Sequence, residues 1–208
     1  PTGALRRYVA IDYGLDMLAA IWIAIDDENH ATVYRVDGGP NKTIGEAADL
    51  ILRDSEGEEI DMYLAPPDLW NRSQESGKSR AQLFSEAHLP LVQSSRDFPA
   101  GCAAMKQWLT VDEKTGKGWL TFYKPGELWT CLTKIQKDDK NADVYAKNPH
   151  GLTHFPDALR YFCVWWTSPA KKPVNIRKRK WSADMYEDYR NANTEERKML
   201  IERWGHPA

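Results

Sequence analysis

The sequence predicts an α/β fold, in which a mixed sheet of three antiparallel strands followed by parallel strands carries helices on both faces. Two observations support this prediction. Three apolar stretches with strand character come first, and short turns rich in Asp, Asn and Gly separate them. After these stretches, segments with helical spacing alternate with short apolar strands. The 208 residues are enough for one domain with a substantial core and an appendage.

The first half of the chain is expected to hold four strands and two helices. The strands are predicted in RRYVAIDYG, MLAAIWIAID, HATVYRVDGG and EIDMYLAP, and the first three should form an antiparallel meander. Thr43 is predicted to cap a helix that stops at Gly57. A second helix is predicted in SRAQLFSEAHLP, with Ser76 or Ser79 as its cap.

The second half alternates between helices and short strands. The expected order is a strand in LVQSS, a helix in FPAGCAAMKQWLTV, part of a hairpin in GKGWLTFYKP, and a short helix in PGELWTCLTKIQ. A loop-like stretch then leads to the last strong helix, THFPDALRYFCVWW. This order of elements is that of the ribonuclease H-like fold.

The composition changes after Pro169. Six basic residues fall within positions 171–180, and the later stretch TEERKMLIERWG is helical in spacing but polar. We therefore predict a domain at residues 1–169 and a basic, helical, partly mobile C-terminal appendage at residues 170–208.

Charge is distributed unevenly along the chain, although the formal net charge is only −2. Residues 1–112 hold 10 basic and 18 acidic residues, whereas residues 113–208 hold 18 basic and 12 acidic residues. This polarity suits a protein that gathers metal-binding acids in one half and holds a polyanion with the other, although a solvated surface is the commoner explanation. Three widely spaced cysteines indicate a reducing compartment, and the sequence predicts no membrane span.

Three acids stand at positions that suit a metal site. Asp12 ends the first strand, Asp68 follows the fourth strand after Pro66 and Pro67, and Asp157 lies at the start of the last helix. Each alone is more often structural, and the helix dipole by itself favours an acid such as Asp157. Together, carboxylates from different elements suit two Mg²⁺ or Mn²⁺ ions, which hydrolyse phosphodiesters. The sequence thus predicts that metal ions pair with Asp157.

Neighbouring residues extend this prediction. His154 shares a helix face with Asp157, so it is a candidate to ligate metal, move a proton or touch phosphate, and equally a half-buried capping histidine. Asp16 is a candidate extra acid. Gly-Lys-Ser at 77–79 resembles the end of a phosphate-binding loop, but the glycine that such a loop needs five residues earlier is replaced by Arg72. The sequence therefore does not predict nucleotide binding at this motif.

Basic residues of the second half are candidates for contact with the DNA backbone, which would be sequence-independent and salt-sensitive. Lysine-rich hairpins are usually only soluble surface, which is the competing interpretation. The candidates are Lys114, Lys117, Lys124, Arg177, Lys178, Arg179 and Lys180.

Three segments in consistent order resemble one known family. HFPDALRYF, YVAIDYG and APPDLWNRSQESGKS are similar to motifs of the nuclease domain of tailed-phage terminase large subunits, as found in siphophages and prophages. The resemblance covers residues 6 to about 168 and implies a ribonuclease H-like, RuvC-like endonuclease with two metal ions that cuts concatemeric viral DNA. By position, the resemblance implies that Asp12 and Asp157 are metal ligands. It also implies that His154 is the histidine that often stands three residues before the helix ligand.

The second acid is less clear from the resemblance. Many relatives have an acid directly after the fourth strand, where this chain has Ala65 and Pro66, so Asp68 is the nearest candidate and Asp61 a weaker one. The resemblance also implies an ATPase motor in the full-length protein, a portal, a small terminase subunit and double-stranded DNA as partners, and the host cytoplasm as location.

Two other functions remain open at this point. The domain could serve mainly to grip DNA or dock on the portal, with cleavage suppressed in isolation. It could also be another ribonuclease H-like nuclease of the resolvase type. Cleavage of plasmid with Mn²⁺ distinguishes the endonuclease from the DNA-gripping or portal-docking module. Competition between DNA substrates distinguishes it from a nuclease of the resolvase type.

Overall fold

The computed structural model describes residues 5–14, 16–111, 113, 116–167 and 181–204. The chain divides into two compact units, Pro1–Ser168 and Pro169–Ala208, which are described separately. The whole of the predicted basic run at 171–180, including Arg177, Lys178, Arg179 and Lys180, lies outside the described residues, as does Lys114.

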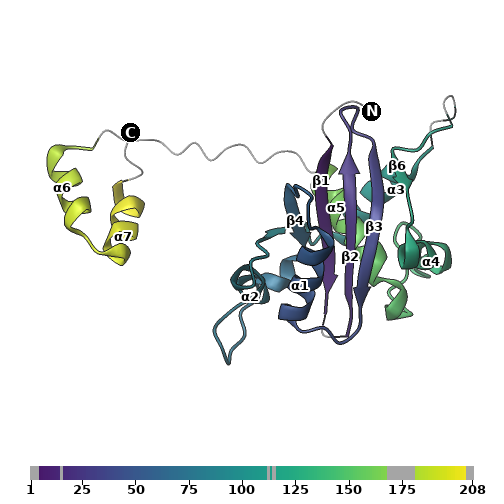
Figure 1. Ribbon diagram of the computed structural model, residues 1–208, viewed down its shortest axis with the longest axis horizontal. Coiled ribbons are helices and arrows are strands. Elements are labelled where there is room, and N and C mark those ends of the chain that lie inside the picture. The colour runs from purple at the N-terminus through teal and green to yellow at the C-terminus, as the bar shows by residue number, and fades with distance from the viewer. Residues whose placement is uncertain (1–4, 15, 112, 114–115, 168–180, 205–208) are drawn as a thin grey trace. The chain divides into compact units, whose positions relative to one another are not determined.

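A six-stranded mixed sheet forms the centre of the first unit, with the strand order β5-β4-β1-β2-β3-β6 (Figure 1). β1 pairs antiparallel with β2 and β2 antiparallel with β3, which confirms the predicted meander. β4 runs parallel to β1, β5 parallel to β4, and β6 parallel to β3. The strands are β1 (Arg6–Tyr13), β2 (Leu18–Ile25), β3 (Ala31–Gly39), β4 (Met62–Ala65), β5 (Leu91–Gln93) and β6 (Leu120–Phe122).

Helices cover both faces of this sheet, as predicted. α1 (Ile44–Asp54) and α2 (Arg80–Glu86) pack over one face, whereas α3 (Phe98–Leu109), α4 (Gly126–Lys134) and α5 (His154–Thr167) pack over the other (Figure 1). Successive residues of a strand point to opposite faces. On β1, Val9 and Ile11 belong to the core under α1 and α2, while Tyr8 and Ala10 belong to the core under α5.

Local capping explains where two of these helices begin. Thr43 and Glu46 form a reciprocal capping box at the start of α1, which confirms Thr43 as the cap. The helix ends at Asp54, with Ser55 as its C-cap, and therefore stops before Gly57. Ser79 caps α2 by accepting a hydrogen bond from the backbone N–H of Gln82.

The structure differs from the sequence prediction at the sheet edge. The hairpin expected in residues 116–125 is wrong for β6, because Leu120–Phe122 pairs in parallel with Ala31–Val33 of β3. Just before β6, one isolated antiparallel bridge links Val111 to Gly118. Strand propensity in a three-residue segment does not encode the partner, which here is distant in sequence.

The second unit contains two helices, α6 (Ala183–Asn191) and α7 (Thr194–Trp204). α7 falls on the stretch predicted as helical, whereas α6 was not anticipated. Ser182 caps α6, and Trp181 packs its ring against Tyr186 and Tyr189 with centroid distances of 5.4 and 5.2 Å. Across the described residues of both units, no helix has the length and apolar character needed to cross a membrane.

Two short 3-10 turns also bear on the candidate site. η1 (Pro67–Trp70) follows β4 directly and carries Asp68, and η2 (His150–Leu152) precedes α5 directly and carries His150.

Candidate metal centre

Asp12 lies near the carboxyl end of β1 and points toward α5. This direction follows from strand alternation, because Tyr8 and Ala10 pack in the core beneath α5 and Asp12 continues the same set. Its side chain is 18% exposed. A rigid central strand therefore holds this carboxylate at the edge of the core.

His154, the first residue of α5, meets Asp12 directly. Its Nδ1 lies 2.8 Å from Oδ2 of Asp12, and its side chain is only 5% exposed. The hydrogen bond to Asp12 raises the pKa of His154, although burial opposes this shift. Burial raises the pKa of Asp12, the bond to His154 opposes it, and the charges of Asp157 and Asp68 add to the rise.

Asp157, in the first turn of α5, has protein partners of its own. Its Oδ1 lies 2.8 Å from Nη2 of Arg160 and 2.9 Å from Nε of the same guanidinium. The hydroxyl of Tyr145 donates to the same oxygen at 2.5 Å. Burial, followed by the charge of Asp157, raises the pKa of Tyr145, so the phenol stays protonated as a donor. Within the described chain, Arg160 and Tyr145 are therefore what pairs with Asp157.

Arg160 is buried beneath α3 and is not completely satisfied. Its guanidinium carbon lies 4.9 Å from the ring centroid of Phe98 and 4.3 Å from that of Tyr161. Among the described residues, no hydrogen-bond partner reaches its buried Nη1. The guanidinium therefore positions Asp157 while being packed between aromatic rings.

Asp68 extends from η1 and pairs with Arg80 at the start of α2. Nη2 of Arg80 lies 2.9 Å from Oδ2 of Asp68, and both side chains are close to half exposed. Asp61, the weaker candidate, lies just before β4, where its backbone N–H bonds to the carbonyl of Arg7. Since β4 runs parallel to β1, Asp61 lies at the opposite end of the sheet from Asp12.

The three predicted acids share one feature. Asp12, Asp68 and Asp157 each have one carboxylate oxygen in contact with a basic side chain. No described residue donates a hydrogen bond to the second oxygen of any of them. Carboxylate oxygens of this kind suit hard divalent cations, and a cation would relieve the repulsion that Asp157 and Asp68 exert on Asp12. The residues present thus fit the expected ions, although their ligand role stays a prediction.

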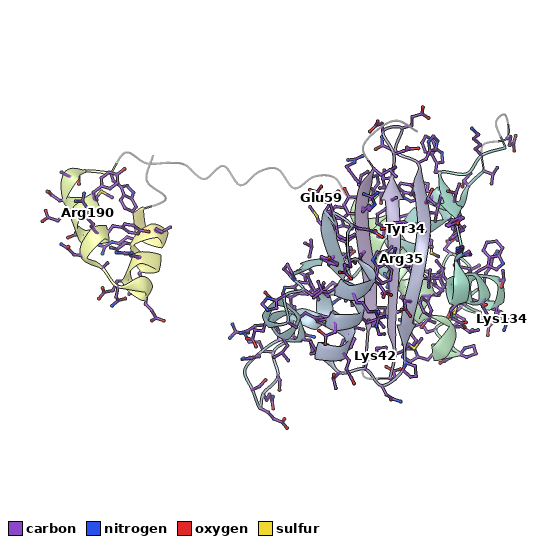
Figure 2. The ribbon with its side chains drawn as sticks, viewed as in Figure 1. Tyr34, Arg35, Lys42, Glu59, Lys134 and Arg190 are labelled. Atoms are coloured by element: carbon purple, nitrogen blue, oxygen red, sulfur yellow. The ribbon has the colours of Figure 1, made fainter. Side chains whose placement is uncertain are left out.

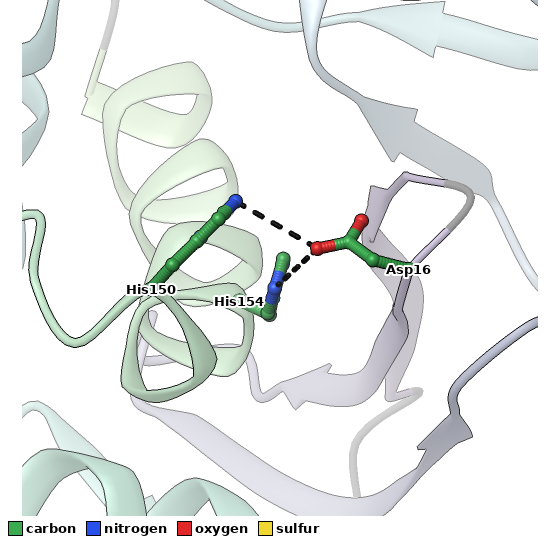
Figure 3. A group of neighbouring side chains, drawn as sticks. All are labelled: Asp16, His150 and His154. Carbon is green, nitrogen blue, oxygen red and sulfur yellow. Dashed lines mark ion pairs between the residues drawn. The ribbon is translucent and has the colours of Figure 1, made fainter.

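A second group is drawn together more tightly than these acids. Asp16, His150 and His154 each direct one ligand atom to a common point, and these atoms lie within 4.8 Å of one another (Figure 3). Among the described residues, this is the one group of histidines, cysteines and acids that is so close. Asp16 was a candidate extra acid, but His150 was missed. The spacing of His150 and His154, four residues apart, was the available signal.

A cavity of about 410 Å³ opens beside Asp157 and has a basic rim. Arg96 and Lys147 are exposed at this rim, and Nζ of Lys147 lies 5.0 Å from the ring centroid of Phe98. Neither cation was singled out from the sequence. The lining residues are Arg96, Phe98, Lys147, Asn148, His150, Thr153, Asp157, Arg160 and Tyr161.

The described lysines that were predicted to bind DNA lie elsewhere. Lys117 and Lys124 flank β6, and β2 and β3 separate that strand from β1. Adjacent strands are about 4.8 Å apart, so these lysines lie three strand spacings from Asp12. Nζ of Lys124 lies 5.3 Å from the ring centroid of Tyr123. The structure thus does not bring them to the candidate metal centre, and their contact with DNA stays a prediction.

Comparisons with known proteins rest on structure rather than sequence. No family model matches the chain, and no curated protein matches it by sequence. Several solved structures are similar in fold, and three of them serve as examples. The large terminase nuclease domain of bacteriophage SPP1 with bound Mn is 14% identical, with a TM-score of 0.51 over 75% of this chain and 84% of that one.

Two further similar structures come from phages G20c and P74-26. The large terminase nuclease of thermophilic phage G20c with bound magnesium is 11% identical, with a TM-score of 0.53 over 78% of this chain and 82% of that one. The large terminase nuclease domain of Thermus phage P74-26 is 9% identical, with a TM-score of 0.53 over 81% and 82%. At these identities the likeness concerns the fold. The chain has the ribonuclease H-like fold of phage large terminase nuclease domains.

Proposed function

We propose that residues 1–168 form a metal-dependent DNA endonuclease domain of a viral genome-packaging terminase. The proposed reaction is the hydrolysis of phosphodiesters in concatemeric double-stranded DNA, with little sequence specificity. The observation that supports it most directly is the set of three acids, each with one oxygen held by a basic side chain and one oxygen without a donor among the described residues. The fold shared with terminase nuclease domains supports the same class of substrate.

Asp12, Asp68 and Asp157 would hold two Mg²⁺ or Mn²⁺ ions. Such ions, when bound, polarise a phosphodiester and offset the charge that develops on the oxygens of the reaction. The contribution of the chain is to fix the carboxylates beforehand. His154 orients Asp12, while Arg160 and Tyr145 orient Asp157. Preorganised ligands of this kind cost no rearrangement when the substrate arrives.

The basic rim of the cavity beside Asp157 is the proposed contact for the DNA backbone. Arg96 and Lys147 are exposed and unpaired with acids in the described structure, so both are available to phosphate oxygens. Contacts with phosphate fix the register of a duplex but do not read its bases, hence the weak sequence specificity. Lys114, Lys117, Lys124 and the basic run near 177–180 would extend this contact.

The biological setting is part of the same proposal. Solved relatives of this fold are named as nuclease domains of large terminases. We infer that this chain works together with an ATPase motor of the same protein, a portal and a small terminase subunit, in the host cytoplasm. The second unit, residues 169–208, is the proposed contact with the packaging machine.

Cleavage of supercoiled plasmid tests the proposal. The wild-type chain is incubated with Mn²⁺, Mg²⁺ or EDTA, beside Asp12→Asn, Asp68→Asn and Asp157→Asn. Asp61→Asn is the matched control, because it removes an exposed aspartate at the opposite end of the sheet. Melting curves check folding, since Asp157→Asn weakens the pairing of a buried guanidinium.

The expected result is nicking and linearisation with Mn²⁺ or Mg²⁺, none with EDTA, and a loss of at least about 100-fold in each folded site variant. Asp61→Asn should cut like the wild type. If Asp68→Asn cuts normally and Asp61→Asn does not, the second acid is misassigned. If the wild type binds DNA but never cuts it under these conditions, a DNA-gripping or portal-docking module replaces the nuclease.

A further inference from the structure

We propose that Asp16, His150 and His154 form a binding site for a divalent transition metal of the zinc class, separate from the carboxylates proposed to hold Mg²⁺ or Mn²⁺. This site has a different donor set, with two imidazole nitrogens and one carboxylate oxygen, and its geometry does not depend on the chain being a nuclease.

The hydrogen bonds of the two histidines determine which nitrogen faces the common point. Nδ1 of His154 contacts Oδ2 of Asp12, an oxygen that accepts, so this nitrogen carries the proton. The hydroxyl of Thr153 donates to the carbonyl of His150 at 2.9 Å, and its oxygen therefore accepts from Nδ1 of His150 at 3.3 Å. In both neutral rings the lone pair then lies on Nε2.

Both of these Nε2 atoms face the same oxygen of Asp16. Oδ2 of Asp16 lies 3.6 Å from Nε2 of His154 and 3.8 Å from Nε2 of His150 (Figure 3). These separations are too long for hydrogen bonds, because a side-chain contact of about 3.6 Å no longer qualifies as one. When the two rings are neutral, two lone pairs and a carboxylate oxygen thus surround one point without a hydrogen atom to join them. A cation at that point satisfies all three donors.

The spacing fits a tetrahedral ion. Ligand atoms at about 2.0–2.1 Å from Zn²⁺ lie about 3.4 Å from one another in a tetrahedron. The separations from Oδ2 of Asp16 are 3.6 and 3.8 Å, and all three ligand atoms lie within 4.8 Å of one another. Exposed Asp16 and His150 can supply the contraction that a tetrahedral ion needs. Imidazole donors favour Zn²⁺, Co²⁺ or Ni²⁺ over Mg²⁺, which prefers oxygen ligands. Three protein ligands leave a fourth position open.

Three neighbouring features prepare the site. The bond from His154 to Asp12 is the carboxylate–histidine arrangement that orients metal-binding imidazoles and raises their basicity. The absence of a side chain at Gly14 gives Asp16 its place, because an added Cβ there would lie 2.4 Å from Oδ1 of Asp16. The rings of His150 and His154 stack at a centroid distance of 4.5 Å, which restricts how each ring can turn.

Titration calorimetry with Zn²⁺ alone, in a buffer free of chelators, tests the proposal on the complete chain. His150→Ala and Asp16→Asn remove exposed ligands, so neither should unfold the protein. His88→Asn and His206→Ala are matched controls for binding at other histidines. The three cysteines are buried and should not contribute. Visible absorption of the Co²⁺ complex reports the coordination geometry.

The expected result is one Zn²⁺ per chain, weakened at least about 10-fold in His150→Ala and in Asp16→Asn but unchanged in both controls. The Co²⁺ complex should show the intense absorption of a four-coordinate ion. Binding that is equal in the wild type, His150→Ala and Asp16→Asn would overturn the proposal. A weak six-coordinate Co²⁺ spectrum would also overturn it.

Asp68→Asn separates this site from the proposed nuclease site. It should lose cleavage and keep Zn²⁺ binding, whereas His150→Ala should lose Zn²⁺ binding. If Asp68→Asn abolishes Zn²⁺ binding as completely as His150→Ala does, the two sites are one and the proposal of a separate site fails. If no variant or wild type cuts DNA but the Zn²⁺ pattern holds, only the proposed nuclease function fails.

Discussion

Nδ1 of His154 lies 2.8 Å from Oδ2 of Asp12, although 142 positions separate the two residues in the chain. This contact joins the first turn of α5 to the end of β1. It also connects two clusters, because Asp12 belongs with Asp68 and Asp157, whereas the opposite nitrogen of His154 faces Asp16. His154 therefore lies between the proposed carboxylate site and the proposed zinc-class site.

Gly14→Ala should weaken Zn²⁺ binding without unfolding the protein. The new Cβ would lie 2.4 Å from Oδ1 of Asp16, and the aspartate side chain must rotate away because the atom in conflict is its flexible end. We expect the Kd for Zn²⁺ to rise by at least about 10-fold, measured by calorimetry. Gly151→Ala is the control, since an added Cβ there meets nothing within 4 Å. Unchanged binding in Gly14→Ala would count against Asp16 as a ligand.

Gly101→Ala should destabilise the first unit. Its Cβ would lie 2.6 Å from Cγ and 2.9 Å from Cδ of Arg160, so the stem that positions Asp157 loses its space against α3. Overpacking of this kind costs about 1–3 kcal/mol, which urea unfolding measures. Gly45→Ala in α1 is the control, and its effect on stability should have the opposite sign. Because nothing lies within 4 Å there, it should stabilise by about 0.5 kcal/mol. If Gly101→Ala left the free energy of unfolding unchanged, Arg160 would be free to move away from the added methyl group.

The capping box of α1 should make stability depend on pH. The backbone N–H of Thr43, followed by its hydroxyl, holds the pKa of Glu46 below its ordinary value. A lowered folded pKa means that this contribution is present above the unfolded pKa, about 4.3, and is lost as pH falls through the folded pKa. Glu46→Gln should therefore have a lower melting temperature than the wild type at pH 7. The difference between the two melting temperatures should disappear at lower pH.

Melting curves across this pH range, with Glu59→Gln as the control, check the prediction. Glu59 is exposed (Figure 2), and its substitution removes the same charge without removing a cap. A gap between wild type and Glu46→Gln that stays constant from pH 7 to low pH would contradict the assignment to the carboxylate.

Arg96→Ala and Lys147→Ala should each weaken DNA binding in proportion to one lost phosphate contact. We expect the slope of log K against log salt concentration to fall by about 1 in each variant. Fluorescence anisotropy with a labelled duplex at several salt concentrations measures this slope. Lys134→Ala, which removes an exposed cation from α4 (Figure 2), should leave the slope unchanged. Equal slopes in all four proteins would exclude the cavity rim as the DNA contact.

Some features of this fold are readable from short stretches of sequence. The period-two pattern of β1 assigns Ala10 and Asp12 to one face, and the Thr43 cap requires only Glu46, three residues later. These features depend on neighbours within one element, so their prediction needs no knowledge of the rest of the chain.

Other features depend on partners that are distant in sequence. The parallel pairing of Leu120–Phe122 with β3, and the meeting of Asp16 with His150, join segments about a hundred residues apart or more. Nothing in a three-residue strand or in an exposed aspartate specifies such a partner. His150 was missed for this reason, despite its spacing of four residues from His154.

Asp157 has some features that the sequence determined and others that depend on the tertiary structure. The sequence by itself determined that this acid opens an amphipathic helix, and it indicated Asp12 and His154 as its companions. Only the tertiary structure decided that Arg160 and Tyr145 hold one of its oxygens, and that a basic cavity lies beside it. The physical reason is that a helix start depends on local backbone geometry, whereas the environment of a buried charge depends on which distant elements the core brings against it.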